Sequence, residues 1–535
     1  MKYKKIIIFT SLATVLFAAG CKKEKFDINS NPDSVTDVSV TPSVLLPGAQ
    51  QFTSSEIAGD WAFLQMWMGY WARSGSYQSI TDVETYRFTN DFQAGIWFNL
   101  YANANNYNIM INKAKESGAG TYEAIGRIMK SHCFQMLTDI YGNLPYSEAL
   151  LGTVKPTPKY DKAVDIYKAI FADLDIAIAL LNNPAVSSVT KNPDIHTADI
   201  VYGNPSLTAI QEDPEQIKKW KKFANTLRLR MIIHLHNGVT STTVAPGISV
   251  SEQVAKITTE GFLGSGESAH LNPGFSGSKP QPYYRFYNTN ESGSGSQRDQ
   301  YRAGKYALEY YRYNSDPRIN RFYVSPSGTT AGQTGITFGT PAGNQDLIGS
   351  KLSTVRGPGL SPDGAASRSW ILTSVESFFL QAEARQRGVL TSGPTAKELL
   401  AAAVRESFIW LKVGTTDVLS SNAADSYISA NAGYPDVDYD EAGGGLFTIL
   451  SQKWFALNTI APFETWSDYR RTDYVLGTPV GYDAGPPISV DPGNTSTKIP
   501  RRLLYPQTEY NYNAANVGAE GKIDVFTGKI FWDLN

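Results

Sequence analysis

The side chains that most often carry catalysis or bind metals are sparse in this chain. The five histidines are His132, His196, His234, His236 and His270. His234 and His236 lie two positions apart on a predicted helix, so they point roughly 200° apart and cannot bind one metal ion. The sequence contains no H-E-x-x-H, G-x-S-x-G, phosphate-binding-loop or G-x-G-x-x-G motif. The sequence therefore predicts neither a metal nor an organic cofactor.

One pair of carboxylates, Glu464 and Asp468, is spaced so that both could lie on one face of a helix. Two carboxylates that flank a glycosidic bond can hydrolyse it. The chain contains 50 acidic residues, however, so a spacing of this kind arises by coincidence. Cys133 lies on an apolar helical stripe and is interpreted as a small core residue. The main prediction is a binding protein without catalytic activity, and a surface glycosidase is the alternative from another class.

Two segments rich in aromatic residues could bind a carbohydrate. Sugar rings present apolar C–H faces, which aromatic rings cover, and hydroxyl groups, which Asn, Asp and Arg can satisfy. The first segment begins at Trp61, and the second lies in a stretch rich in Gly, Ser and Pro. Because Trp67 and Trp71 have helical spacing, at least half of the first segment is expected to belong to the core. The predicted ligand-binding residues are Trp61, Trp67, Trp71, Tyr77, Tyr283, Tyr284, Tyr287, Asn288, Arg298 and Asp299.

The charge balance argues against a nucleic-acid ligand. The formal net charge is -2, and the first 20 residues contain three lysines and no acids, which leaves -5 on the remainder. Nucleic-acid binding requires clustered positive charge instead. Aromatic residues make up 12% of the chain and charged residues only 18%. This balance favours aromatic rings at the surface, where they can recognise a ligand.

The N-terminus resembles a bacterial lipoprotein signal. Three lysines precede an apolar run from residue 6 to 19, which is shorter than the ~20 residues that span a bilayer. Small residues then precede Cys21, as in a lipobox, although Ala18 stands where leucine is usual. We expect residues 1–20 to be a signal peptide, Cys21 to carry the lipid, and 21–44 to form a tether. Cys133 is then the one remaining cysteine, so no intramolecular disulfide can form.

Seven stretches place apolar residues three and four positions apart, which predicts amphipathic helices. Pairs of such helices joined by short loops with glycine are expected to pack antiparallel. Repeated hairpins predict a mainly α fold, a tetratricopeptide-like α-helical solenoid with little β structure, in blocks about 93–240 and 370–475. The stretches are Trp97–Ala114, Tyr122–Ile140, Val164–Leu181, Trp220–Met231, Leu372–Ala382, Leu400–Leu411 and Phe447–Leu457.

Long irregular excursions interrupt these helical blocks. Residues 262–300, 323–369, 413–445 and 476–500 are rich in Gly, Ser, Pro and Asn, and they are too long for simple connections. Such segments on a rigid scaffold often bind ligands, although they could instead cover the ends of the solenoid with small strands. We expect one domain over 45–535, with excursions about 241–369 and 476–500.

Several segments spread over most of the chain carry residue patterns that one protein family shares, in the same order. Besides the lipobox, these segments are Asp27–Pro32, Trp97–Asn105, Asp139–Ala149, Trp220–Arg230, Glu376–Ala384 and Pro500–Pro506. They resemble the SusD/RagB family of outer-membrane nutrient-binding lipoproteins, and Asp139–Ala149 is the most specific match. Each segment also has a local structural interpretation: Gly142 is expected to adopt positive φ, and Arg228 and Arg230 to pair with carboxylates or helix C-termini.

The resemblance implies a lipid-anchored protein on the outside of the outer membrane. Family members capture oligosaccharides, or in some cases peptides, and deliver them to a SusC-type TonB-dependent β-barrel transporter that they cover as a lid. The resemblance implies no catalysis. The family's ligand residues do not transfer position by position, because the loops vary. A peptide-capturing protein and a purely structural solenoid bound only to the barrel remain alternatives, and the identity of the ligand stays open.

Overall fold

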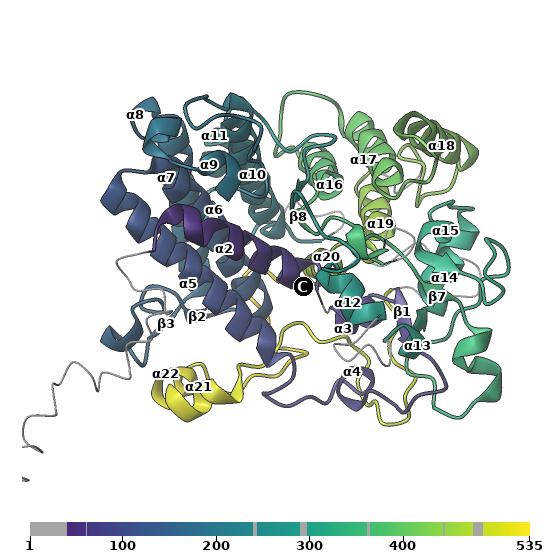
Figure 1. Cartoon of the computed structure of the whole chain (residues 1–535). Helices are drawn as coiled ribbons and strands as arrows, with labels where there is room; N and C mark the ends of the chain where they lie inside the picture. The colour runs from purple at the N-terminus through teal and green to yellow at the C-terminus, as the bar shows by residue number, and fades with distance from the viewer. Residues whose placement is uncertain are drawn as a thin grey trace, which may run out of the picture. The chain divides into compact units, whose positions relative to one another are not determined.

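The structure, a computed structural model, describes residues 40–59, 61–238, 243–288, 297–360, 364–441, 445–473 and 485–535. Cys21, the predicted signal peptide and most of the predicted tether lie outside the described residues. The chain from Pro42 to Asn535 forms one compact unit. Its secondary structure is mainly helical, with short strands, as the sequence predicts (Figure 1).

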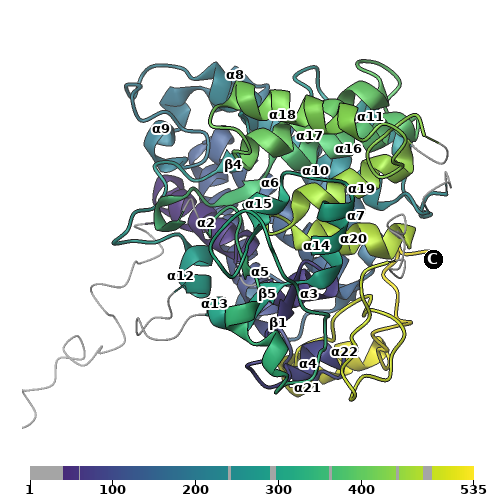
Figure 2. The ribbon, with the colours of Figure 1, turned by 90° about the vertical axis from the view of Figure 1, so that its right-hand side faces the viewer.

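Two sets of packed helices form the scaffold. In the first set, α5, α6 and α7 pack side by side, α2 crosses α5 and α6, and α10 covers α6 and α7 (Figure 1). In the second set, α17 lies between α16 and α18 (Figure 2). Contact between α10 and α16 joins the two sets. The bounds are α2 (Pro42–Ile57), α5 (Ala94–Ser117), α6 (Gly120–Tyr141), α7 (Ala163–Leu181), α10 (Pro214–His234), α16 (Ser374–Gln386), α17 (Ala396–Trp410), α18 (Asp417–Ala430), α19 (Leu446–Leu457) and α20 (Pro462–Thr472).

Local signals in the sequence set the ends of these helices. α5 ends at Gly118, whose φ of 70° is left-handed and therefore suits glycine. Asp213 caps α10 by accepting a hydrogen bond from the Gln216 N–H. All seven predicted helices are present. Leu372 was placed in one of them but belongs to a strand, because the Thr373 side chain caps the helix that begins at Ser374.

Two of the longer helices, α18 and α2, lie where the sequence predicts none. α18 falls within the predicted excursion 413–445, because its buried face consists of Ser420, Ala424 and Tyr427 and lacks an aliphatic stripe. α2 begins at Pro42, so residues 42–44 of the predicted tether are helical. The excursion at 413–445 is therefore in large part a further helix of the scaffold.

Short strands and helices fill the predicted excursions. β1 joins three strands from 301–355 in an antiparallel sheet of order β1-β5-β7-β6, and β2 pairs with β3 and β4 with β8. The strands are β1 (Trp71–Arg73), β2 (Leu144–Pro145), β3 (Tyr160–Asp161), β4 (Ala269–His270), β5 (Tyr301–Ala303), β6 (Tyr323–Val324), β7 (Thr354–Val355) and β8 (Trp370–Leu372). The short helices are α3 (Ala62–Trp67), α4 (Thr81–Glu84), α8 (Pro184–Ser187), α9 (Ile195–Ala198), α11 (Val250–Ala255), α12 (Pro282–Asn288), α13 (Gln297–Gln300), α14 (Lys305–Tyr313), α15 (Ile319–Phe322), α21 (Gln507–Tyr512), α22 (Ala514–Ala519), η2 (Gly152–Val154), η3 (Val189–Lys191), η4 (Gln345–Leu347), η5 (Gly349–Lys351) and η6 (Gly364–Ala366).

The family-like segments meet in the core as a network of buried charges. Arg230 forms two hydrogen bonds with Glu376, at 2.7 and 2.9 Å, and Arg228 pairs with Asp175 at 2.6 Å. Gly142 has a φ of 78°. These contacts confirm the structural interpretation of both arginines and of the glycine. Within the described ranges, every helix is too short or too polar to cross a bilayer.

Candidate ligand-binding site

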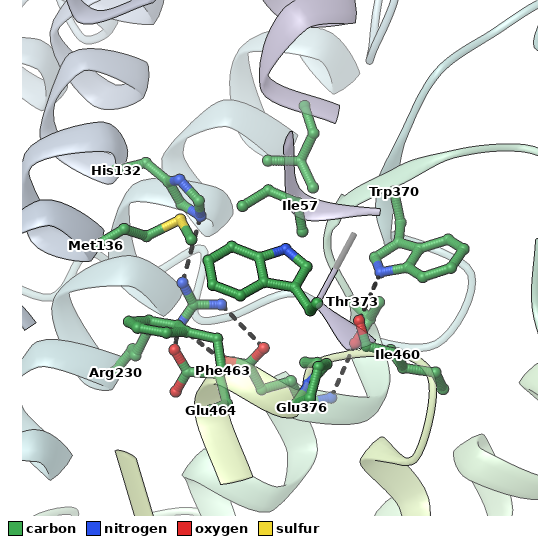
Figure 3. Close-up of a pocket in the computed structure, with 14 residues that line it drawn as sticks. Ile57, His132, Met136, Arg230, Trp370, Thr373, Glu376, Ile460, Phe463 and Glu464 are labelled. Carbon is green, nitrogen blue, oxygen red and sulfur yellow. Dashed lines mark hydrogen bonds and ion pairs between the residues drawn. The ribbon is translucent and has the colours of Figure 1, made fainter. Parts of the chain in front are cut away.

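An internal cavity lies between α6, α10, α16 and α20, and His132, Arg230 and Glu376 are among the residues that line it (Figure 3). Its volume is about 30 Å³. That volume suits about one water molecule, whereas ligand sites measure roughly 300–1,000 Å³. Burial and the Arg230 charge lower the pKa of His132 to about 3, so this imidazole is neutral. The cavity is therefore part of the core and too small for a sugar ring.

The two carboxylates considered for glycosidase chemistry, Glu464 and Asp468, both form buried ion pairs. Glu464 lies 3.0 Å from His234 Nε2 and 3.4 Å from Arg230 Nε. Asp468 lies 2.9 Å from Lys453 Nζ and 2.7 Å from Arg471 Nη2. Both side chains are buried, and their partners neutralise them. Nothing in this arrangement presents an acid and a base to a sugar in an open cleft.

The structure brings the two predicted aromatic segments together, but inside the core. Trp71 stacks on Tyr283 with ring centroids 6.2 Å apart and an interplanar angle of 10°, and it also contacts Tyr287. Trp67 and Trp71 are fully buried, at 0% exposure. Trp61 lines the internal cavity and donates to the Glu56 carbonyl at 2.8 Å. In this conformation these five rings are covered by protein, so direct stacking on a ligand would require their neighbours to move.

The other predicted residues lie nearer the surface. Tyr77 is 38% exposed, and Arg298 and Asp299 are exposed on the short helix α13. The Asn288 side chain lies outside the described residues. Tyr284 is half-buried, and a Cβ atom on Gly364 would lie 4.0 Å from its ring, so Tyr284 packs against η6. Tyr284 is therefore a neighbour of η6, and its contact with a ligand stays a prediction.

An open hollow of about 380 Å³ lies between the end of α17 and the segments that flank β4 and β8. Its volume falls within the roughly 300–1,000 Å³ of small-molecule sites. Pro358 and Gly359 line it from the segment before η6, and Trp410 and Lys412 line it from the end of α17. The described residues that line it are His270, Pro358, Gly359, Ala366, Ser367, Arg368, Trp410 and Lys412.

The pairing of β4 with β8 creates one side of this hollow. His270 is in register with Trp370, and the Leu271 N–H donates to the Ser369 carbonyl at 2.9 Å. This pairing places Arg368 across from His270, although the two lie 98 positions apart in the sequence, and their side chains hydrogen-bond. A second feature of this wall is the Ser367 hydroxyl, which is buried and has no hydrogen-bond partner among the described residues. A buried hydroxyl without a partner is uncommon.

The protonation state of His270 follows from its two neighbours. Its Nδ1 lies 2.7 Å from the Ser268 carbonyl oxygen, which can only accept, so Nδ1 carries the hydrogen. Burial and the positive charge of Arg368 lower the pKa of His270. The neutral ring therefore accepts a hydrogen bond from the Arg368 guanidinium at Nε2. His270 orients Arg368 without neutralising its charge.

Trp410, the last residue of α17, is the most distinctive group in the hollow. The other nine of the ten tryptophans are buried, and Trp410 is half-buried. Its Nε1–H donates to Ser268 Oγ at 3.2 Å, and its ring lies nearly perpendicular to Trp370, at 86°. Ser268 is in turn 2.7 Å from Ser374 Oγ, which donates to Glu406 at 2.6 Å. This chain of buried hydrogen bonds fixes the orientation of the indole.

A second hollow, of about 460 Å³, is lined by residues 202–206, α10 and Asn272. Lys219 lies 5.8 Å from the centre of the Tyr202 ring there, and Asp213 and Glu215 also line the hollow. No tryptophan is among its described lining residues, and its charges are mixed. We therefore take the hollow beside Trp410 as the candidate site. Within the described ranges, no group of three His, Cys, Asp or Glu side chains could hold a metal ion.

Reasoning from the sequence did not identify Trp410, Arg368, His270 or Lys412. One signal for Trp410 was present, because it follows Phe408 of the predicted apolar stripe by two positions. Two positions turn a helix by roughly 200°, which places Trp410 on the side opposite the core. Neither Arg368 nor His270 carries a comparable signal, since strand pairing alone brings them together.

The comparisons with known proteins agree on one family. The profile of the SusD-like family, described as "Starch-binding associating with outer membrane", matches residues 32–506. No curated protein sequence matches the chain. Among solved structures, a SusD homologue from Bacteroides fragilis is 22% identical, with a TM-score of 0.68 over 92% of this chain and 99% of that one. A chitin-binding SusD homologue from Flavobacterium johnsoniae is 22% identical, with a TM-score of 0.67 over 92% and 97%.

The solved structures establish the shared fold, and the profile match spans most of the chain. The family associates with the outer membrane and binds nutrients such as glycans. Its members are binding proteins and not typically enzymes, in keeping with the buried, neutralised carboxylates described above. The chain therefore belongs to the SusD-like family of outer-membrane nutrient-binding proteins.

Proposed function

We propose that this protein captures an oligosaccharide in the hollow beside Trp410 and delivers it to a SusC-type TonB-dependent transporter. One observation carries the proposal: a single tryptophan of ten lies at the surface, and it lines an open hollow. Tryptophan packs well on the apolar face of a sugar ring, and its own orientation here is fixed by hydrogen bonds. The chitin-binding activity of the Flavobacterium johnsoniae relative belongs to that protein, and it supports a saccharide as the first ligand to test.

The polar groups around Trp410 suit the hydroxyl groups of a saccharide. Arg368, which is exposed, can donate to them. Pro358 and Gly359 add apolar lining to the hollow. Tyr284, beside η6, could extend the platform for a longer chain. No acid–base pair lines this hollow within the described residues, so the proposal is binding without hydrolysis.

The sequence and the family also support a proposed location and partner. We propose that Cys21 carries a lipid that anchors the protein at the outer face of the outer membrane. A polar tether then lets the compact unit swing over the transporter as a lid. Lipid analysis of the mature protein, with Cys21→Ser as the comparison, tests this anchor directly. A Cys21→Ser protein that stayed in the membrane fraction without detergent would contradict it.

The binding site is tested with the mature chain, residues 21–535 with Cys21→Ser so that it carries no lipid. Calorimetry and tryptophan emission are measured with chitin, starch and acidic oligosaccharides and with peptides. We expect a saccharide to bind and to change the emission of Trp410, because the other tryptophans are buried. Trp410→Ala should lower the affinity at least about tenfold, equivalent to about 1.4 kcal/mol.

The matched control is Tyr512→Ala, which removes another aromatic ring from the surface. Tyr512 is 76% exposed and lies on α21, outside the hollow. This variant should bind the saccharide as the parent protein does. Equal binding by the Trp410→Ala variant and the parent would refute the site, and binding of peptides alone would favour the peptide-capturing alternative.

A further inference from the structure

Both surface hollows are lined by the segment that begins with β4. His270 lines the hollow beside Trp410, and Asn272 lines the second hollow. These two residues reach the surface, whereas the residues that alternate with them, Ala269 and Leu271, are buried. Side chains two positions apart on an extended strand lie on the same face, roughly 7 Å apart. The segment therefore contributes neighbouring side chains of one face to both hollows.

Backbone hydrogen bonds tie this segment to a lining element of each hollow. The pairing of β4 with β8 places it beside Arg368, which lines the hollow beside Trp410. The Asn272 N–H donates to the Ile200 carbonyl at 2.7 Å. Ile200 leads into residues 202–206, which line the second hollow. The two hollows are therefore parts of one hydrogen-bonded surface region.

An electrostatic interaction also connects the two hollows. Burial and the charge of Arg368 lower the pKa of His270, and the positive charge of Lys219 lowers it further. His270 lines the first hollow and Lys219 the second. Charges in solution influence each other over about 10 Å at ordinary ionic strength. The second hollow therefore begins within reach of a chain of a few sugar rings that starts in the first.

The second hollow combines paired charges with uncharged polar groups. Asp213 caps α10, and Glu215 pairs with Lys218 at 3.5 Å. Lys219 lies 5.8 Å from the centre of the Tyr202 ring. Amide and hydroxyl groups, which can both donate to sugar hydroxyls and accept from them, also line this hollow. They belong to Asn204, Ser206 and Asn272. This lining suits the hydroxyl groups of a sugar better than a free ion.

We propose that the two hollows are consecutive subsites for one glycan chain, which packs a sugar ring on Trp410 and passes His270 and Asn272 into the second hollow. This inference rests on the proposed function and specifies its ligand as an oligosaccharide long enough to reach both hollows. Trp410 supplies the orienting contact, and the second hollow binds hydroxyl groups further along the chain. Once the first ring is bound, the second contact is intramolecular, so it adds affinity.

The test measures affinity against the length of the saccharide. Calorimetry is carried out on the unlipidated mature chain with chito-, malto- and galacturono-oligosaccharides, from the disaccharide to the hexasaccharide of each series. In a series that binds, the hexasaccharide should bind at least about tenfold more tightly than the disaccharide, because it contacts both hollows. A single hexasaccharide should bind to each protein chain.

Variants of the second hollow separate its contribution from that of the indole. Lys219→Ala and Asn272→Ala should each weaken the hexasaccharide far more than the disaccharide, so that most of the gain with length disappears. Trp410→Ala should weaken both ligands. The control is Lys221→Ala, because Lys221 is turned by roughly 200° from Lys219 on α10 and pairs with Glu260 at 2.9 Å. The control should bind every saccharide as the parent does, and thermal unfolding checks that all variants are folded.

The failure of this inference can be told apart from the failure of the proposed function. Equal affinity for all lengths would overturn the inference, and so would a gain with length that survives in both Lys219→Ala and Asn272→Ala. Two hexasaccharides per protein chain would replace consecutive subsites by separate sites. These three results leave the proposed function intact if Trp410→Ala still weakens binding. If no saccharide binds, or if Trp410→Ala binds each one as the parent does, the proposed function and this inference both fail.

Discussion

Replacing His234 by glutamine should destabilise the protein strongly at neutral pH and much less at high pH. His234 ends α10 and is fully buried between two carboxylates, with Nδ1 2.9 Å from Asp139 and Nε2 3.0 Å from Glu464. Both ring nitrogens face acceptors, and only the charged imidazolium can donate from both. Burial opposes this charge, but Glu464 and Asp139 outweigh it and raise the pKa of His234 to about 9.

The size of the effect follows from the change in pKa. The ordinary value is 6.5 and the folded value about 9, which at about 1.36 kcal/mol per unit gives on the order of 3 kcal/mol. Because the folded pKa is raised, this stabilisation is complete below pH 6.5 and disappears as the pH rises through about 9. Removing one partner of a buried ion pair generally costs about 3–5 kcal/mol, which agrees with this figure. For His234→Gln we expect the lower end of that range, since Asp139 keeps hydrogen bonds from Tyr167 and Trp532.

Urea unfolding followed by tryptophan emission measures the difference between parent and His234→Gln from about pH 6 to about pH 10, the range set by linkage. The difference in the free energy of unfolding should be largest at the acidic end and shrink toward the basic end. His236→Gln is the control, because burial lowers the pKa of His236 and its Nδ1–H donates to the Ile232 carbonyl. The difference in the free energy of unfolding between the parent and His236→Gln should therefore not shrink above pH 7. A His234→Gln difference that stays constant across the whole range would refute a charged imidazole.

Two further predictions concern the loop beside the candidate site and the thiol in the core. Gly357→Ala should lower the free energy of unfolding by about 1–3 kcal/mol and weaken saccharide binding. The reason is that Gly357 has a φ of 138° and that a Cβ atom there would lie 2.2 Å from Thr459 Oγ1. Urea unfolding measures the stability and calorimetry the binding. An unchanged midpoint of urea unfolding would contradict the prediction. Cys133 is fully buried, and burial raises the pKa of its thiol, so a thiol reagent should modify it only as the protein unfolds. Rapid modification in native buffer would contradict this.

The long helices could be predicted because their buried faces are aliphatic and aromatic. The stretch Trp97–Ala114 corresponds to α5, and each of the other six stretches also lies largely within a helix. α18 was not predicted from the sequence because Val418 and Leu419 are exposed, while Ser420 and Ala424 face the core. A helix that buries small residues against a neighbour leaves no hydrophobic period in the sequence.

The candidate site was harder to predict, because aromatic density marks packing in this chain. Trp67 is surrounded by other rings, including Phe63 at 5.1 Å, and its Nε1–H donates to the Val83 carbonyl. A tryptophan whose polar atom is satisfied by the backbone can be buried completely. The sequence pattern alone does not distinguish such a ring from one that binds a sugar. The pairing of β4 with β8, which joins His270 to Arg368, depends on contacts between distant segments and leaves no local signal.

The arrangement of the hollow gives a ligand a fixed platform. Trp410 is held by Ser268, which belongs to a buried relay that ends at Glu406. A ring that is already ordered loses little conformational entropy when a ligand arrives, which favours binding. Arg368 also lines the hollow and is exposed, and its side chain hydrogen-bonds to His270. Trp410→Ala should therefore weaken every ligand that packs on the indole, whereas Arg368→Gln should weaken only ligands that accept a hydrogen bond from the guanidinium.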